Sequence, residues 1–408
     1  MLSILPLTLS YHTSAPLQLR AVAARSSTPI AFLEPSTLLP AAAPFVAPLE
    51  NAVSGALGET ALAEFSGPVS SAVSIVVAYV LFSTVGKVVI QLALDAVIKA
   101  TQGIGSVSDS KYEKGKVIGR GSYGEVYESD GVVIKATNSR DPRGDEFSEA
   151  ELFMNRKLSL LGQSGCMAKF EGHYFDDDGS RCLVFKREGT LTLDRALQGN
   201  FPWNVEGALL GRESDTKDAD AAAKVIRRIS GQVFSNLAGI HGWSVVHRDV
   251  KGANLILAED AKRFKLLDFG AACDLFSRTN YDPQLQVFDP KYGPPECTVT
   301  NAQRGEGGLV LSAGGRFDVF SAGLLVVQMC FKAYRTENGI VGFKKSLDAV
   351  DYDLDAWRAA AENRKENAEG FAILDKYGGF QLLKGCLKRA PSQRISSAAA
   401  ASSGFCRA

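Results

Sequence analysis

A long apolar run lies near the N-terminal end of the sequence. FSGPVSSAVSIVVAYVLFSTVG, from Phe65 to Gly86, contains no charged residue. As a helix, these 22 residues would extend about 33 Å at roughly 1.5 Å per residue, which is enough to cross the hydrocarbon core of a membrane. Because apolar spacing continues through VVIQLALDAVI, we predict a transmembrane helix with its extension over residues 65–97. The alternative is a buried core helix or a peripheral amphipathic segment.

Beyond Lys111 the pattern changes to shorter apolar runs, separated by turns and charges. ESDGVVIKAT is rich in β-branched residues, which is typical of a strand. EFSEAELFMNRKLSLL instead places Phe147, Ala150, Phe153 and Leu158 at helical spacing. We therefore expect strands and helices in the remainder of the chain, after a linker at residues 98–111.

The charges around the apolar run predict its orientation. Between Arg25 and Lys87 there is no Lys or Arg, whereas several lysines follow the run. The excess of basic residues on one side places the C-terminal part on the cytoplasm-like face of the membrane. The formal net charge of the whole chain is zero, so nothing in the composition indicates a nucleic acid as a partner.

Two further features bear on the compartment. The first 35 residues or so are rich in Ser, Thr and Ala and include Arg20 and Arg25, which is typical of an organelle targeting segment. An untargeted disordered tail is the alternative. The seven cysteines begin only at Cys166 and include no CxxC pair, so we expect a reducing environment for residues 112 onward.

A glycine-rich motif opens the C-terminal part of the chain. IGRGSYGEVY has the spacing G-x-G-x-x-G-x-V, and a strand rather than a helix follows it. A dinucleotide-binding βαβ unit would need a helix at that point, so the motif is better explained as a hairpin that covers the phosphates of a nucleotide. The residues expected to contact ATP are Ile118, Gly119, Arg120, Gly121, Ser122, Tyr123, Gly124, Val126 and Lys135.

Lys135 ends the strand that follows, and the strand VVIKA matches the one whose lysine holds the α- and β-phosphates. Such a lysine needs an acidic partner to orient it. The helix from Glu146 offers Glu149 and Glu151, and the spacing of Glu149 to Leu152 and Phe153 favours Glu149 as the inward-facing partner.

The stretch VVHRDVKGANLIL, from Val245 to Leu257, contains the spacing H-R-D-x-K-x-x-N between two apolar runs. This is the catalytic-loop signature of protein kinases. Asp249 would accept the hydroxyl proton, Lys251 would steady the transferred phosphoryl group, and Asn254 would bind Mg²⁺. Asp268, in the motif KLLDFG, would be the second magnesium ligand.

With these four motifs in order, the chain resembles the eukaryotic protein kinases over residues 112 to about 400. Pro294-Pro295-Glu296 occupies the position of the family's A-P-E, and RFDVFSAGLL and KRAPSQRIS carry the family's Asp318, Gly323 and Arg394. The resemblance implies an α+β, two-lobed fold, with a β-rich N-lobe at residues 112–186 and a helical C-lobe at residues 190–405. It also implies that Asp318 braces the catalytic loop and that Arg394 pairs with Glu296.

The residues around the catalytic aspartate imply the acceptor and its regulation. Lys251 resembles the residue found in serine/threonine kinases, rather than the A-A-R or R-A-A of tyrosine kinases. In the family, an arginine at the position of Arg248 often binds a phosphate on the activation loop. Candidate acceptors for such a phosphate are Ser277, Thr279 and Tyr281.

A narrower resemblance is to the thylakoid serine/threonine kinases that act in state transitions and phosphorylate photosystem II core and antenna proteins. It rests on LVFKREGTLTL, DFGAACDLFSRTNYDPQLQVFDPKYGPPE and RFDVFSAGL, and on the order of the segments. It implies a plastid targeting segment at residues 1–35, a lumenal acidic tail at residues 36–64, and a stromal kinase domain at residues 112–405. Redox-controlled members carry two lumenal cysteines, but no cysteine precedes Cys166 here.

Two other functions remain open at this point. The first is a membrane-anchored serine/threonine kinase of another compartment. The second is a pseudokinase scaffold, which would normally lack the lysine or one of the two aspartates, although Lys135, Asp249 and Asp268 are all present.

Overall fold

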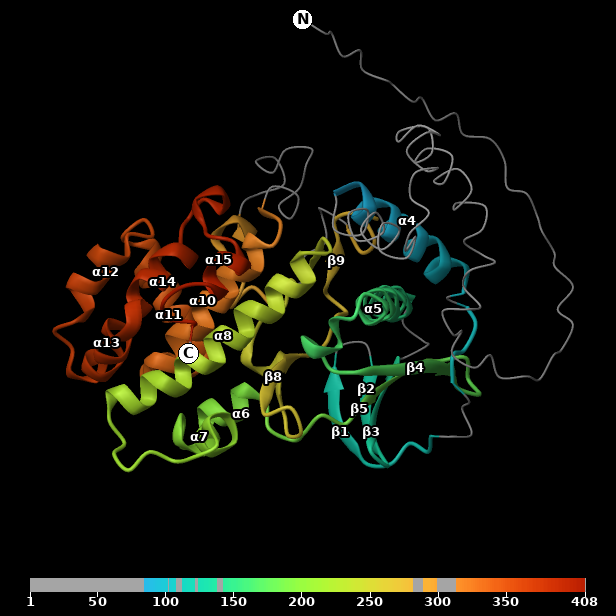
Figure 1. Ribbon diagram of the computed structural model, residues 1–408, viewed down its shortest axis with the longest axis horizontal. Coiled ribbons are helices and arrows are strands. Elements are labelled where there is room, and N and C mark those ends of the chain that lie inside the picture. The colour runs from blue at the N-terminus through green and yellow to red at the C-terminus, as the bar shows by residue number, and fades with distance from the viewer. Residues whose placement is uncertain are drawn as a thin grey trace, which may run out of the picture.

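The computed structural model describes residues 84–101, 103–107, 112–121, 124–137, 142–281, 289–298 and 313–407. These residues form two lobes, one built on a β-sheet and one almost entirely helical (Figure 1). This is the arrangement expected from the sequence. The predicted targeting segment, the acidic tail and residues 65–83 of the predicted membrane helix lie outside the described residues.

The smaller lobe contains one antiparallel sheet with the strand order β1-β2-β3-β5-β4. Strands that follow each other through a short turn pair with each other. β3 pairs with β5 and not with the next strand β4; helix α5 (Pro142–Leu160) and β4 lie between them in the sequence. α5 packs against β3, β4 and β5, so one side of the sheet is covered by the helix (Figure 1). The strands are β1 (Val117–Gly121), β2 (Gly124–Ser129), β3 (Val132–Thr137), β4 (Phe170–Phe175) and β5 (Arg181–Lys186).

Helix α4 (Thr84–Ala100) lies on the opposite side of α5 from the sheet (Figure 1). It buries Gln91, Asp95 and Ile98 against the lobe, although the sequence places these residues in the extension of the membrane helix and the start of the linker. Within the described part of the chain, no helix has the length and apolar character needed to cross a membrane.

The larger lobe is organised around two helices that contact each other, α8 (Ala219–His241) and α10 (Arg316–Cys330). α8 begins at Asp218, whose side chain accepts hydrogen bonds from the backbone N–H groups of Asp220 and Ala221. The other helices are α6 (Leu193–Gln198), α7 (Trp203–Leu210), α11 (Glu337–Asp348), α12 (Leu354–Ala361), α13 (Ala368–Asp375), α14 (Gly379–Cys386) and α15 (Ser397–Ala401).

Two small antiparallel ladders lie where the larger lobe meets the sheet lobe. β6 (Val245–Val246) pairs with β9 (Cys273–Asp274), and β7 (Leu255–Ala258) pairs with β8 (Arg263–Leu266). The segment between β6 and β7 contains the H-R-D motif, and the segment between β8 and β9 contains D-F-G. The ladders therefore bring the two motifs side by side, although they are separated in sequence.

Candidate active site

The glycine-rich motif forms the hairpin of β1 and β2, as the sequence predicts. A Cβ atom on Gly124 would lie 2.2 Å from the carbonyl oxygen of Ala136, so no side chain fits there. Val126 pairs in register with Lys135 on β3, which places the lysine next to the hairpin. Ser122 and Tyr123, at the tip, lie outside the described residues.

Lys135 connects three elements of the site. Its Nζ atom lies 2.7 Å from Oε2 of Glu151 on α5 and 2.7 Å from Oδ1 of Asp268 in the D-F-G segment. The sequence-based choice of Glu149 is corrected here, because the partner of Lys135 is Glu151. Glu149 is exposed on α5, whereas the side chain of Glu151 is only 4% exposed.

The error has a structural reason. Residues on a helix rotate by about 100° each, so Glu149 and Glu151 point to nearly opposite sides. The spacing argument assumed that α5 has one apolar face. In the structure α5 is covered by the sheet on one side and by α4 on another, so its residues 150–155 are all buried. Apolar periodicity alone could not tell which of these faces points toward Lys135.

The charges of this cluster shift one another's ionisation. Burial raises the pKa of Glu151 to about 7, although Lys135 acts in the opposite direction. Burial also acts to raise the pKa of Asp268, but the ammonium group of Lys135 outweighs it and lowers the pKa to about 2. The two carboxylates in turn overcome the effect of burial on Lys135 and raise its pKa above the usual range. The lysine therefore stays charged and ready to bind a phosphate.

The catalytic loop brings its three predicted residues together. The amide of Asn254 donates hydrogen bonds to the backbone carbonyl of Asp249, at 2.9 Å, and to its Oδ2 atom, at 2.8 Å. Nζ of Lys251 lies 2.9 Å from the same Oδ2 atom and 3.7 Å from Asp289. Oδ1 of Asp249 is buried and has no hydrogen-bond partner among the described residues. An unsatisfied buried acceptor at this place suits an incoming hydroxyl group.

Asp318 of α10 binds the backbone of the catalytic loop. Its carboxylate, which is fully buried, accepts hydrogen bonds from the backbone N–H groups of His247 and Arg248 at 2.7 and 2.8 Å, and it contacts Nε2 of His241 at 2.8 Å. Arg248 has a φ of 64°, a left-handed conformation that side chains rarely adopt. The hydrogen bonds to Asp318 therefore stabilise a strained backbone, which agrees with the bracing role implied by the resemblance.

The residues expected to bind Mg²⁺ offer suitable chemistry. Asn254 and Asp268 contribute a carboxamide and a carboxylate oxygen, and Mg²⁺ prefers such ligands. Across the ranges that the structure describes, no group of three or more His, Cys, Asp or Glu residues could hold a metal ion.

The segment after D-F-G already has internal partners for its polar groups. Arg248 donates hydrogen bonds to the carbonyl oxygens of Ala271, at 2.5 Å, and Asn280, at 2.9 Å. The hydroxyl of Ser277 lies 2.8 Å from Asp274 and 2.7 Å from the hydroxyl of Thr279. Candidate acceptors Ser277 and Thr279 are thus bonded to each other, and the arginine binds backbone carbonyls of the same segment.

Two family residues of the larger lobe, Arg394 and Gly323, make close contacts, and the pairing of Arg394 is the predicted one. Arg394, whose side chain is fully buried, makes two hydrogen bonds to the carboxylate of Glu296, at 2.7 and 2.5 Å. Gly323 allows α10 to approach α14, because a Cβ atom there would lie 2.9 Å from a side-chain carbon of Cys386. The segment with Pro295 and Glu296 is thereby attached firmly to the helical lobe.

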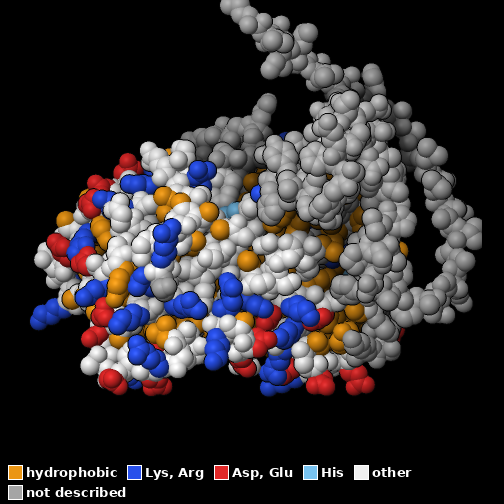
Figure 2. All heavy atoms as spheres, in the orientation of Figure 1, with side chains coloured by type: hydrophobic (Ala, Val, Ile, Leu, Met, Phe, Trp, Pro, Cys, Tyr) orange, Lys and Arg blue, Asp and Glu red, His pale blue; other side chains and the backbone are white. Residues whose placement is uncertain are grey.

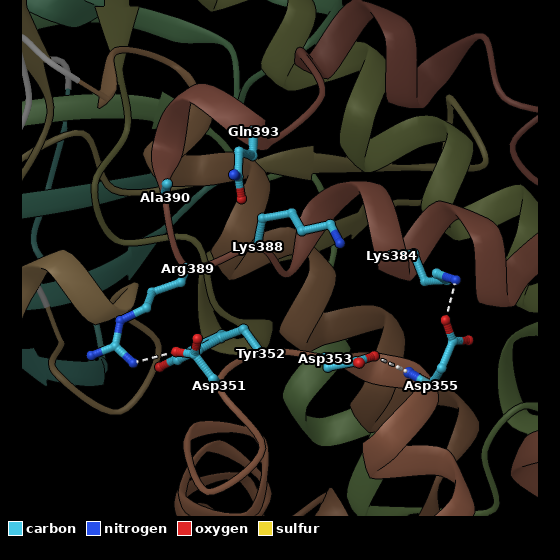
Figure 3. Close-up of a pocket in the computed structure, with 9 residues that line it drawn as sticks. All are labelled: Asp351, Tyr352, Asp353, Asp355, Lys384, Lys388, Arg389, Ala390 and Gln393. Carbon is cyan, nitrogen blue, oxygen red and sulfur yellow. Dashed lines mark hydrogen bonds and ion pairs between the residues drawn. The ribbon is translucent and has the colours of Figure 1, made fainter.

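A cavity elsewhere in the larger lobe is not part of this site. It has a volume of about 800 Å³, and none of the predicted catalytic, ATP-binding or metal-binding residues lines it. Figure 3 shows two ion pairs among its lining residues, Lys384 with Asp355 and Arg389 with Asp351. On the face of this lobe that Figure 2 shows, basic and acidic side chains are interspersed. Because none of the predicted site residues lines the cavity, we assign it no role in the chemistry.

Comparisons with known proteins agree with this geometry. The family model described as the protein kinase domain matches residues 112–406. The chain is 33% identical over 314 residues to the serine/threonine-protein kinase STN7, chloroplastic, of Arabidopsis thaliana, a match that covers 70% of this chain and 55% of that protein. It is 32% identical over 296 residues to STN8, chloroplastic, of the same plant, covering 66% and 58%.

A solved structure is also similar. The crystal structure of a Stt7 homolog from Micromonas algae soaked with ATP aligns with a TM-score of 0.62 at 27% identity, covering 74% of this chain and 94% of that chain. The chain spans a little over half the length of STN7 and STN8. The resemblance to the chloroplast kinases and the two-lobed fold, both predicted from the sequence, are confirmed by these matches.

Proposed function

The chain belongs to the protein kinase family, and we propose that it is an ATP-dependent serine/threonine protein kinase. One observation carries the proposal. Lys135 meets Glu151 of the sheet lobe and Asp268 of the D-F-G segment at 2.7 Å each, the arrangement that a kinase needs in order to transfer phosphate. The relatives STN7 and STN8, which are named serine/threonine-protein kinases, support the acceptor class.

In this proposal each residue has one task. Lys135 holds the α- and β-phosphates, while the backbone of the glycine-rich hairpin covers them. Asp249 accepts the proton of the substrate hydroxyl at Oδ1, and Lys251 steadies the transferred phosphoryl group. ATP supplies that group. Asn254 and Asp268 would hold a magnesium ion, which would neutralise charge on the phosphate oxygens. Catalysis therefore depends on positioning and charge, not on a covalent intermediate.

The acceptor class rests on Lys251. Its ammonium group lies 2.9 Å from Asp249 and 3.7 Å from Asp289, so it stands where the acceptor hydroxyl and the phosphoryl group must meet. Acid hydrolysis of a labelled product should release phosphoserine or phosphothreonine. Phosphotyrosine as the main product would refute the assignment.

We further propose that the kinase is attached to the thylakoid membrane of the chloroplast through Phe65–Gly86, with its kinase domain at residues 112–405 on the stromal side. Its substrates would be photosystem II core or light-harvesting proteins. Support comes from the uncharged run, the lysines after it, and relatives that are named chloroplastic. Attachment to the membrane would raise the local concentration of membrane-bound substrates. Attachment in another compartment is the competing proposal.

A substitution of the proposed base tests the enzymatic function. Asp249→Asn should leave ATP binding intact but lower kcat by roughly a hundredfold or more, because the proton acceptor and the alignment of the hydroxyl are lost together. Incorporation of labelled phosphate into a generic protein acceptor measures kcat, and calorimetry measures ATP binding. Near-native turnover of this variant would contradict the role assigned to Asp249. A wild-type chain that binds ATP without transferring phosphate would favour the pseudokinase alternative.

Phosphoproteomics tests the substrates. Thylakoids isolated with and without this chain should differ in the phosphorylation of photosystem II core or antenna proteins. If the affected phosphoproteins belong to another membrane, the kinase assignment would stand and the thylakoid proposal would fall.

A further inference from the structure

A lysine with no access to solvent connects three elements at the back of the active site. Lys157 of α5 is fully buried, and its Nζ atom lies 2.5 Å from Oδ2 of Asp274 on β9. The same atom lies 3.0 Å from Oδ1 of Asp95 on α4. The Asp274 side chain is also fully buried, and that of Asp95 is 9% exposed. A charged group is buried in this way only where its partners are well placed.

Lys157 and Asp274 lie at the same sequence distance from Glu151 and Asp268, the two residues that contact Lys135. Lys157 follows Glu151 by six residues on α5, and Asp274 follows Asp268 by six residues on the segment after D-F-G. The helix and the segment are therefore tied at two points, through Lys135 at the first and through Lys157 at the second. Two ties fix the direction of α5 as well as its distance from the segment, whereas a single tie would allow it to swing.

Helix α4 completes the second tie. Besides Asp95, its C-terminal end holds α5 through Thr101, whose hydroxyl and carbonyl oxygens accept hydrogen bonds from Arg156 at 2.7 and 3.3 Å. Near its other end, Nζ of Lys87 lies 5.6 Å from the centre of the Trp243 ring in the helical lobe. α4 therefore contacts both lobes and lies along the outer side of α5 (Figure 1).

The cluster also reaches the segment that would carry a regulatory phosphate. Asp274 accepts hydrogen bonds from the backbone N–H of Phe276, at 2.9 Å, and from the hydroxyl of Ser277, at 2.8 Å. The Nζ atom of Lys157 lies 5.5 Å from the centre of the Phe276 ring. A shift of Lys157 would therefore change the position of both α5 and the first turn of this segment.

We propose that Asp95 and Lys157 are positioning residues for phosphoryl transfer, and that α4 belongs to the catalytic unit although it precedes the family match at residues 112–406. The inference rests on the proposed kinase function. Asp95 and Lys157 touch no nucleotide or substrate group; they act through α5, by keeping Glu151 in contact with Lys135. α4 would thus hold the site in its aligned state.

The primary variant is Asp95→Asn in the full-length chain. It keeps the size of the side chain and leaves the pair of Lys157 and Asp274 intact, so the protein should fold. Burial already raises the pKa of Asp95, although the contact with Lys157 at 3.0 Å opposes the shift, so the neutral amide should be tolerated at this position. Lys157→Met is less suitable, because it would leave two buried carboxylates without their cation.

We expect Asp95→Asn to weaken ATP binding and lower kcat/KM roughly fivefold or more, a factor typical of coupling between separate sites. The matched control is Asp177→Asn, the same chemical change at an exposed residue between β4 and β5, which should leave both quantities unchanged. A change in thermal stability of Asp95→Asn without a change in ATP affinity or kcat/KM would mean a merely structural role and would overturn the proposal.

A double-mutant cycle with Glu151→Gln tests the route of the effect. Because Asp95 is proposed to act through Glu151, adding Asp95→Asn to Glu151→Gln should cause little further loss of ATP affinity or kcat/KM. Independent effects that multiply would overturn the proposal.

Measuring ATP affinity allows the role of α4 to be tested even if the proposed kinase function is wrong. If the wild-type chain binds ATP but transfers no phosphate, the kinase assignment fails, yet the cycle can still be measured by calorimetry. A non-additive loss of ATP affinity would then support the role of α4, and an additive one would refute it.

Discussion

At the scale of single residues, the site is a chain of opposite charges in which each group depends on its neighbours. Lys135 stays protonated because Glu151 and Asp268 surround it, and Asp268 stays ionised because of Lys135. Of these three groups, Glu151 loses its charge most easily near neutral pH, because burial raises its pKa to about 7. Changes to Glu151 should therefore reveal whether this cluster controls the activity.

The corrected lysine partner gives a direct comparison within one helix. Glu151→Gln should lower kcat/KM for ATP roughly tenfold or more, because Lys135 loses the carboxylate that directs it toward the phosphates. Glu149→Gln, at an exposed position on the same helix, should lose far less. Steady-state kinetics with varied ATP would measure both variants. A larger loss of kcat/KM for Glu149→Gln than for Glu151→Gln would support Glu149 as the partner of Lys135.

The pKa of Glu151 predicts a pH dependence. Below about pH 7 this carboxyl group binds a proton and loses the charge that pairs with Lys135, so kcat/KM for ATP should decline as the pH falls through that value. The pH dependence of kcat/KM reports on groups of the free enzyme, and the decline should level off near the value of the Glu151→Gln variant, which mimics the protonated carboxyl group. The Glu151→Gln variant should lack the inflection, since Gln does not titrate. An unchanged inflection in this variant would assign it to another group.

At the scale of elements, the sequence was sufficient for the motifs whose residues have a fixed spacing. The hairpin of β1 and β2, the lysine on β3, and the H-R-D and D-F-G segments lie where their spacing predicts. It was insufficient for α5, because α4 covers a second side of that helix and its apolar residues therefore do not form a single face. The buried Lys157 could not be predicted either, since its two partners come from distant segments.

The attachment of the P-P-E segment to the helical lobe can be tested through Arg394. Arg394→Met should lower the free energy of unfolding by about 3–5 kcal/mol, because the Glu296 carboxylate is left buried without its partner. Arg389→Met is the control from the same region, since the Arg389 side chain is 61% exposed and its pair with Asp351 should contribute no more than about 1 kcal/mol. Thermal or denaturant unfolding measures both. Equal losses would contradict the importance of the buried pair.

At the scale of the whole molecule, α4 stands between the predicted membrane segment and the catalytic lobes. The uncharged run ends at Gly86, and α4 begins at Thr84, so a membrane helix would lead directly into the helix that packs on α5. Attachment to a membrane would then be separated from the active site by one rigid element and not by a long flexible linker. This arrangement would restrict how far the kinase can reach from the membrane surface.

The topology of the full-length chain tests this arrangement. If Phe65–Gly86 spans the thylakoid membrane with the kinase domain in the stroma, protease added to intact, right-side-out thylakoids should digest the region 112–408 and leave a small N-terminal fragment in the membrane. Alkaline carbonate should not extract the chain, because a spanning helix resists it and a peripheral protein does not. Immunoblots against the two ends would follow the fragments. Protection of the kinase domain from protease would reverse the orientation, whereas release by carbonate would mean that the apolar run is a soluble helix packed on the protein.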